Sequence, residues 1–551
     1  HLISVGLHLL VCVLLDANLA RARAPVVARY ASLATFGMLG IHAEPVAVIS
    51  FREDLLAAAL GLAALYLATP RGAPRPPPAA SIGAVLCMMA ATGAKLSAAP
   101  LPVFAWLWWR WPRWRPAAPN GAAAWSCGLL ALGVALGLGV RWHMAGQLMP
   151  YAADDPRLAT VPASVLDQWA TGLVISAKVL AQTVLPFDLR PEYTPAHHAF
   201  TSTPMRIATA GFITVVVASL LRRWRHPAGI LSVMFLAWLV LWLPTSNVLP
   251  LPNPRADRYA YLPSVPICIA LGALFERALS AHGRWRSMVM VTGAAFIVLH
   301  GSLGVAASRS YRSNANLWRV ASERTPDSAR AQAMHGILLL SRLDSRPAPD
   351  TDLLDAAETA CQRALALDAT DAHPHLCFAR LRTAQKNWAE ALTHLTRGVE
   401  RAPVRQDSIE AARLELLPDV LAAEPPEQLR AVVLERSSAL MRRYPYSPSI
   451  MEATGRVLHR LGLPYQAGMA YRAASHRRPE RGVTIARRIA LGIDLGDLEG
   501  VEALLEGRNM LRNQINETER TALLARFRLL SRLRQRTLVH SATPTAGPLL
   551  P

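Results

Sequence analysis

The sequence predicts an all-α protein in which a multi-span membrane domain precedes a solenoid of helical hairpins. Up to about residue 310 the chain is a series of long apolar segments, which are typical of membrane spans. Beyond that point small residues and prolines recur with a period of about 34 residues. Hydrophobic residues make up 52% of the 551 residues, a high share for a wholly soluble chain. We therefore expect a membrane domain at 1–309, a helical-repeat domain at 310–540 and a disordered tail at 541–551.

Ten apolar segments predict the membrane spans once their flanking residues are included. They are 2–20, 26–41, 53–69, 80–94, 97–110, 121–142, 205–221, 228–243, 262–279 and 286–308. Arginines cluster in five of the connections, which the positive-inside rule places in the cytoplasm. These connections are 21–29, 71–79, 110–118, 222–227 and 277–286. The opposite side then receives the loops around residues 42–52, Lys95, 143–204 and 244–261, and the repeats after them.

Residues 165–186 are apolar but do not fit this alternation of sides. Counting them as a span would move the arginines at 222–225 to the outer side. We therefore predict a helix that lies at, or dips into, the outer membrane interface.

The net charge of +20 does not predict nucleic-acid binding, because many of the arginines lie in short loops between apolar segments. The six cysteines predict no disulfide framework. Four of them lie in apolar segments, and Cys361 and Cys377 are expected to be packing residues of the repeat helices.

The repeat domain is predicted from small residues at tetratricopeptide positions 8, 20 and 27, a larger apolar residue at position 24 and a proline at position 32. In 448–481 these positions hold Gly455, Ala467, Tyr471, Ala474 and Pro479. In 372–405 they hold Ala379, Ala391, Leu395, Gly398 and Pro403. Small residues allow two helices to cross closely, and the proline ends the second helix. Gly336, Ala357 and Ala364 indicate an earlier repeat, and 485–507 indicates a later helix pair.

Three outer loops hold the candidate site. The first contains His42, Glu44, Arg52 and Asp54, the second contains Lys95, and the third contains Asp257, Arg258, Tyr259 and Tyr261. Ionisable side chains near the membrane core are costly, so they indicate function. Arginine grips two phosphate oxygens and lysine supplies a point charge, which suits a phosphate-bearing substrate. The alternative is that these charges pair with one another and only stabilise the loops.

The membrane half resembles the transmembrane-and-tetratricopeptide-repeat O-mannosyltransferases and their bacterial relatives, which are C-type (GT-C) glycosyltransferases. The first-loop pattern is matched by His42, Glu44, Arg52, Asp54, Leu55 and Leu56, with Leu39-Gly40 in place of His-Pro. The family's Ser-Lys-Glu reads Ala94-Lys95-Leu96, and its Glu-Arg-Tyr motif reads DRYAYLPS at 257–264. LPTSN at 243–247, VLPFDLRPEY at 184–193 and NANLWRVASERTP at 314–326 also match. The resemblance covers about 1–330.

The resemblance implies sugar transfer from a polyprenyl-phosphate donor to a protein acceptor on the extracytoplasmic side. Lys95, Arg258 and Arg52 would then bind the donor phosphate. His42, Glu44, Asp54 and Asp257 would bind or orient the sugar, and Tyr259 and Tyr261 would contact sugar or lipid or anchor the loop in the interface.

The family takes its catalytic base or metal ligand from an earlier outer loop. His1 corresponds to its second span, so we expect the natural N-terminus to be missing and assign no catalytic residue. No metal ligand or firm cofactor is assigned, and the need for a divalent metal is open.

The expected partners are the bilayer, a lipid-linked sugar, and a protein or peptide bound by the repeats. The expected location is a bacterial inner membrane with the repeats in the periplasm. Two alternatives stay open: a non-enzymatic membrane-tethered scaffold for envelope assembly, and a transferase like the O-antigen ligases.

Overall fold

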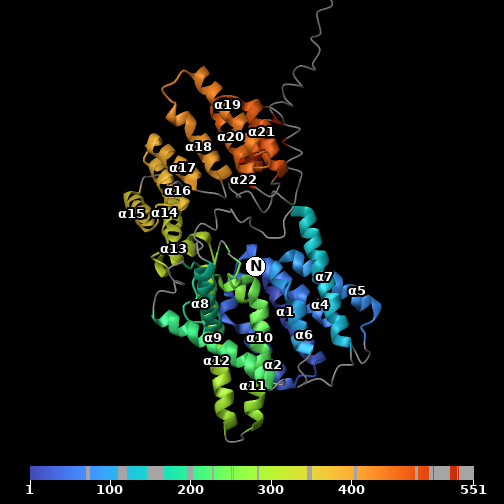
Figure 1. The fold of residues 1–551 in the computed structure, drawn as a ribbon. Helices are drawn as coiled ribbons and strands as arrows, with labels where there is room; N and C mark the ends of the chain where they lie inside the picture. The colour runs from blue at the N-terminus through green and yellow to red at the C-terminus, as the bar shows by residue number, and fades with distance from the viewer. Residues whose placement is uncertain are drawn as a thin grey trace, which may run out of the picture. The chain divides into compact units, whose positions relative to one another are not determined.

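The structure is a computed structural model that describes most of the chain. The described residues are 1–69, 75–109, 121–145, 165–194, 203–225, 229–249, 251, 253–281, 285–343, 350–401, 406–477, 482–495, 501, 521–529 and 531–532. Within these ranges every regular element is a helix, which confirms the all-α prediction (Figure 1). The predicted tail at 541–551, the repeat prolines Pro403 and Pro479, and most of 496–507 lie outside the described residues.

The first compact unit comprises His1–His335, so the expected border at 309/310 lies inside it. Its longer helices are α1 (Leu2–Arg21), α2 (Val26–Met38), α4 (Arg52–Ala68), α5 (Pro78–Ala94), α6 (Leu101–Trp109), α7 (Ala122–Ala145), α8 (Val165–Val184), α9 (Thr203–Arg225), α10 (Ile230–Trp242), α11 (Ser264–Ala281), α12 (Arg286–Ser310) and α13 (Asn314–Arg324). Each of the ten predicted spans corresponds to one of these helices.

Within the described ranges, three helices are long and apolar enough to cross a membrane: Leu2–Arg21, Ala122–Met144 and Arg286–Ser310. The other predicted spans form helices that fall short in length or hydropathy. α2 has 13 residues, which at a rise of about 1.5 Å each cover only about two-thirds of a hydrocarbon core about 30 Å thick. The membrane prediction is thus supported for three helices and stays a prediction for the rest.

The core of the first unit is built from the inward faces of these helices. α4 packs against α5, α5 against α7, and α2 against α11. α8 is anchored by Trp242, whose indole N–H donates to the Ser176 hydroxyl at 2.7 Å. α8 packs against α9 and is hydrogen-bonded to α10, and its predicted place at the membrane interface stays a prediction.

The second compact unit comprises Gly336–Pro551. Its helices are α14 (Ala329–Leu343, which begins in the first unit), α15 (Thr351–Leu367), α16 (Ala372–Ala384), α17 (Trp388–Arg401), α18 (Gln406–Val420), α19 (Pro426–Arg443), α20 (Pro448–Arg460), α21 (Pro464–Arg477) and α22 (Gly482–Leu495). Neighbouring helices pack as α15 on α16, α16 on α17, and α20 on α21 (Figure 1). The predicted helical hairpins at 372–401 and 448–477 are therefore present.

The small residues lie at the predicted helix crossings. Ala391 and Ala467 are fully buried, and a Cβ atom on Gly455 would lie 2.6 Å from Cε1 of Tyr471 on the facing helix. Such a separation is below any ordinary van der Waals contact. Glycine at 455 therefore allows α20 and α21 to approach at this point.

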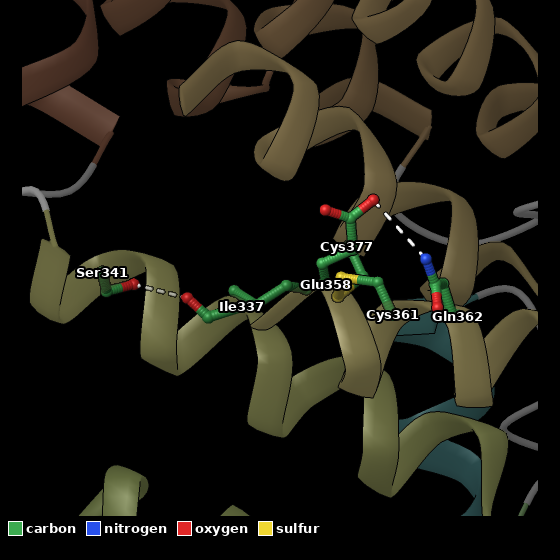
Figure 2. Close-up of a disulfide and its surroundings, with 6 residues drawn as sticks. All are labelled: Ile337, Ser341, Glu358, Cys361, Gln362 and Cys377. Carbon is green, nitrogen blue, oxygen red and sulfur yellow. Dashed lines mark hydrogen bonds between the residues drawn. A yellow bond between two sulfur atoms is a disulfide. The ribbon is translucent and has the colours of Figure 1, made fainter. Parts of the chain in front are cut away.

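The expectation that Cys361 and Cys377 are only packing residues is wrong, because the structure joins them in a disulfide (Figure 2). The bond links α15 to α16 with a Cα–Cα distance of 5.5 Å, well within the range for disulfides. Gly336 of α14 faces it, since a Cβ there would lie 2.6 Å from Sγ of Cys377. Cys12, Cys87, Cys127 and Cys268 of the first unit are not disulfide-bonded.

Candidate functional site

The candidate site is built where three connections between helices of the first unit meet. The chain between α2 and α4 forms two short turns, η1 (Gly40–His42) and η2 (Ile49–Phe51), with a single helical turn, α3 (Ala43–Ala47), between them. The turn η7 (Asp257–Ala260) packs against η1 and α3. The loop at Lys95, between α5 and η3 (Leu96–Ala98), approaches the start of α4. Residues more than 200 positions apart in the sequence thereby become neighbours.

Glu44 and Arg258 form a contact at two points. One carboxylate oxygen of Glu44 accepts from the backbone N–H of Arg258 at 2.8 Å, and the other pairs with its guanidinium at 2.5 Å. The two side chains are 8% and 14% exposed. Burial opposes the charge on Arg258, but the carboxylate of Glu44 outweighs it and raises the pKa of the guanidinium. This pair therefore fixes an arginine of η7 in its charged form.

Lys95 forms a second ion pair with the start of α4. Its ammonium lies 2.5 Å from a carboxylate oxygen of Asp54 and 3.3 Å from one of Glu53. Asp54 is buried, whereas the side chain of Glu53 is 51% exposed. The shorter and more buried contact with Asp54 therefore determines where the ammonium lies.

Both cations lie beside one aromatic ring. Tyr259 has the ammonium of Lys95 at 5.8 Å and the guanidinium carbon of Arg258 at 4.9 Å from its ring centroid. The guanidinium of Arg258 also lies 4.0 Å from the ring centroid of Phe51. Both cations interact with the charge of Asp54. We refer to Glu44, Glu53, Asp54, Lys95, Arg258 and Tyr259 as the outer-loop cluster.

Three predicted site residues make other contacts. Arg52 donates from Nε to the hydroxyl of Ser4 at 3.3 Å, toward the N-terminal end of α1. His42 shares a hydrogen bond of 2.9 Å with the hydroxyl of Ser264. Tyr261 shares one of 2.8 Å with the ring of His8.

The rings of His8, Phe36, His42 and Tyr261 form one aromatic group. His42 and Tyr261 are buried, and burial lowers the pKa of His42 well below its usual value. These rings therefore pack η1 and the end of η7 against each other.

Asp257 has a partner that the sequence analysis missed. Its carboxylate accepts from the phenol of Tyr193 at 2.7 Å, and both side chains are buried. Burial raises the pKa of Asp257 to about 7; the nearby Glu44 carboxylate acts in the same direction, and Tyr193, Arg255 and Arg258 oppose it. Asp257 therefore titrates near neutral pH.

The outer-loop cluster has the chemistry of an anion site whose cations are already neutralised. Two cations face the carboxylates of Glu44, Glu53 and Asp54. A bound phosphate would have to displace one carboxylate or share a cation with it, since removing an ion from its partner in a buried setting is costly. Among the described residues, no group of three or more His, Cys, Asp or Glu side chains is arranged to hold a metal ion. No protein-family model matches the chain, and no curated protein matches it either.

Proposed function

We propose that this chain is a membrane glycosyltransferase of the GT-C type, which transfers a sugar from a polyprenyl-phosphate donor to a protein acceptor outside the cytoplasm. The observation that carries the proposal is the position of Lys95 and Arg258 against the same ring of Tyr259. Two cations beside an aromatic face suit a phosphate attached to a sugar, since the cations bind the phosphate oxygens and the ring packs on the sugar.

The reaction would form a bond between the acceptor hydroxyl oxygen and the anomeric carbon and break the bond from that carbon to the phosphate oxygen. The electron pair of the broken bond remains with the polyprenyl phosphate, whose growing negative charge Lys95 and Arg258 would stabilise. The acceptor proton passes to a base that we do not assign.

The repeats, of the tetratricopeptide type in this proposal, would bind the acceptor or a partner outside the cytoplasm. The disulfide between Cys361 and Cys377 supports that location, because such bonds persist mainly in oxidising compartments. A bacterial periplasm, as expected from the sequence, is one of these.

The alternative of a non-enzymatic membrane-tethered scaffold is favoured by a different observation. Each cation of the outer-loop cluster already has a carboxylate partner, as a purely structural loop network would require. The two functions differ in one measurable respect, since only the transferase binds a polyprenyl-phosphate sugar through these cations.

The test is binding of a polyprenyl-phosphate mannose to the purified chain and its variants in nanodiscs. Arg258→Ala should weaken binding about 10- to 100-fold, since a charge-assisted hydrogen bond contributes about 1.5–3 kcal/mol. Arg258→Lys should restore only part of the lost affinity, because an ammonium cannot bind two phosphate oxygens in the way a guanidinium does. Arg29→Ala is the matched control, because Arg29 forms an ion pair with Asp16 at 2.7 Å elsewhere in the first unit. Unchanged binding by folded Arg258→Ala and Lys95→Ala proteins would refute the proposal.

A further inference from the structure

The segment that follows α8 is hydrogen-bonded to the C-terminal end of α13 and to the turn after it. Arg190 donates to the carbonyl of Arg324 at 2.8 Å, and Arg324 donates back to the carbonyl of Leu189 at 2.8 Å. The hydroxyl of Thr325 donates to the carbonyl of Glu192 at 2.9 Å. The hydroxyl of Thr194 bonds to the carboxylate of Asp327 at 3.1 Å. We call residues 189–194 with 324–327 the clamp.

Tyr193 belongs to the clamp, and its hydroxyl both accepts and donates a hydrogen bond. It accepts from the backbone N–H of Arg190 at 3.1 Å, so its own proton is directed to the carboxylate of Asp257, 2.7 Å away. The guanidinium of Arg255 covers the ring at 3.9 Å from its centroid. The phenol therefore has one orientation, set by the clamp on one side and by Arg255 on the other.

Asp257 joins the clamp to the outer-loop cluster. The next residue, Arg258, is held by Glu44 through both its backbone N–H and its guanidinium. The charged or titratable groups that act on Asp257 come from four segments. They are Glu44 of α3, Tyr193 of the segment after α8, Arg255 of the loop before η7, and Arg258 of η7 itself. Tyr311, which follows α12, also lies near enough to interact with Asp257 and Glu44.

We infer that Tyr193 is a positioning residue that stabilises the ionised form of the Asp257 carboxylate and ties the outer-loop cluster to the end of α13 and the turn after it. The inference rests on the proposed function only in its consequence for donor binding. The Tyr193 bond lets Asp257 ionise at a lower pH than it would without that bond, and it holds η7 against the clamp. Without it, Asp257 takes up a proton at higher pH, because the hydrogen bond that stabilised the carboxylate is gone.

The first measurement needs no donor: thermal unfolding of the full chain in nanodiscs between pH 5.5 and 8.5. Because folding raises the pKa of Asp257 above its usual value, the folded state binds more protons than the unfolded state between the two values. The stability contributed by Asp257 therefore falls as pH rises to about 7 and then levels off. In Tyr193→Phe the fall should continue to higher pH. The loss of Tm relative to the wild type should thus be larger at pH 8.5 than at pH 5.5.

The control is the same substitution in an Asp257→Asn background, where it should lower Tm equally at all pH values. A purely packing role for Tyr193 predicts a pH-independent loss in both backgrounds, and that result would overturn the inference. If Tyr193→Phe does not fold, Thr325→Val weakens the clamp from the other side and should produce the same pH-dependent loss to a smaller degree. Arg319→Ala is the matched control for Thr325→Val. Arg319 lies on α13, but its ion pair at 2.7 Å is with Glu323 of the same helix and not with the clamp.

The second measurement is binding of polyprenyl-phosphate mannose across the same pH range. The pH of half-maximal affinity should move upward in Tyr193→Phe, while affinity at the high-pH plateau stays within about two-fold of the wild type. A pH-dependent loss of Tm without any donor binding by the wild type would support the inference and refute the proposed function. Donor binding with a pH profile that does not shift in Tyr193→Phe would support the proposed function and refute the inference.

Discussion

At the scale of single residues, the outer-loop cluster holds each cation through a different carboxylate. Arg258 depends on Glu44, whose side chain is 8% exposed, and Lys95 depends mainly on buried Asp54. Buried charges that lose their partner are strongly destabilising, whereas exposed ones are not. The three carboxylates of the cluster are therefore expected to differ widely in their importance.

Glu44→Gln should lower the stability of the ligand-free chain by about 3–5 kcal/mol, because it leaves the Arg258 guanidinium buried without an anion. Polyprenyl phosphate would supply the missing anion, so the rise in Tm on its addition should be larger in the variant than in the wild type. Glu53→Gln is the control, since Glu53 is half-exposed and lies 3.3 Å from Lys95. Equal ligand-induced shifts in the variant and the wild type would argue against phosphate binding at Arg258.

The sequence predicts which loops carry the site residues but not which atoms meet. Lys95 and Arg258 are recognisable from the sequence because isolated cations between apolar segments stand out. Tyr193 is not, because it lies 64 positions from Asp257 and nothing local marks it as a partner. Arg52 was expected at the phosphate, yet it donates to Ser4. A long arginine side chain can reach in several directions, and its actual direction depends on packing between distant segments.

At the scale of helices and hairpins, prediction is strongest. Helices form at each of the ten apolar segments, because hydropathy along the chain is a local property. The hairpins at 372–401 and 448–477 also follow from the sequence, since small residues must lie at close helix crossings. The disulfide does not, because pairing depends on which helices become neighbours.

Gly455→Ala should destabilise the repeat unit by about 1–3 kcal/mol, because the new methyl group would overlap the buried ring of Tyr471. Ala467→Trp should act in the same direction at the same crossing. Gly468→Ala is the matched control, as its Cβ would have an ordinary contact of 3.5 Å with Leu491 and alanine favours the helix. The measurement is chemical unfolding of the full chain, in which cleavage of the repeat unit by limited proteolysis reports the unfolded fraction. A stable Gly455→Ala protein would mean that the crossing of α20 and α21 is looser than described.

At the scale of the whole molecule, the arrangement of arginines predicts which compartment each part occupies. Reporter fusions after Arg225 should be active in the cytoplasm, and fusions after Pro326 should be active outside it. In intact cells, Cys361 and Cys377 should resist a maleimide reagent until the protein is reduced. Cys87→Ser is the control for labelling of the free thiols. A cytoplasmic signal at Pro326 together with reactive Cys361 and Cys377 would contradict the proposed side of the membrane for the repeats.

The two bonded cysteines are only 16 residues apart in the chain. At a synthesis rate of about 5–20 residues per second, the second cysteine emerges within a few seconds of the first. In an oxidising compartment α15 and α16 can therefore be joined while the helices from α17 onward are still being made. Assembly of the second unit would then proceed in one direction, with a covalently closed pair of helices as the surface on which each later hairpin docks.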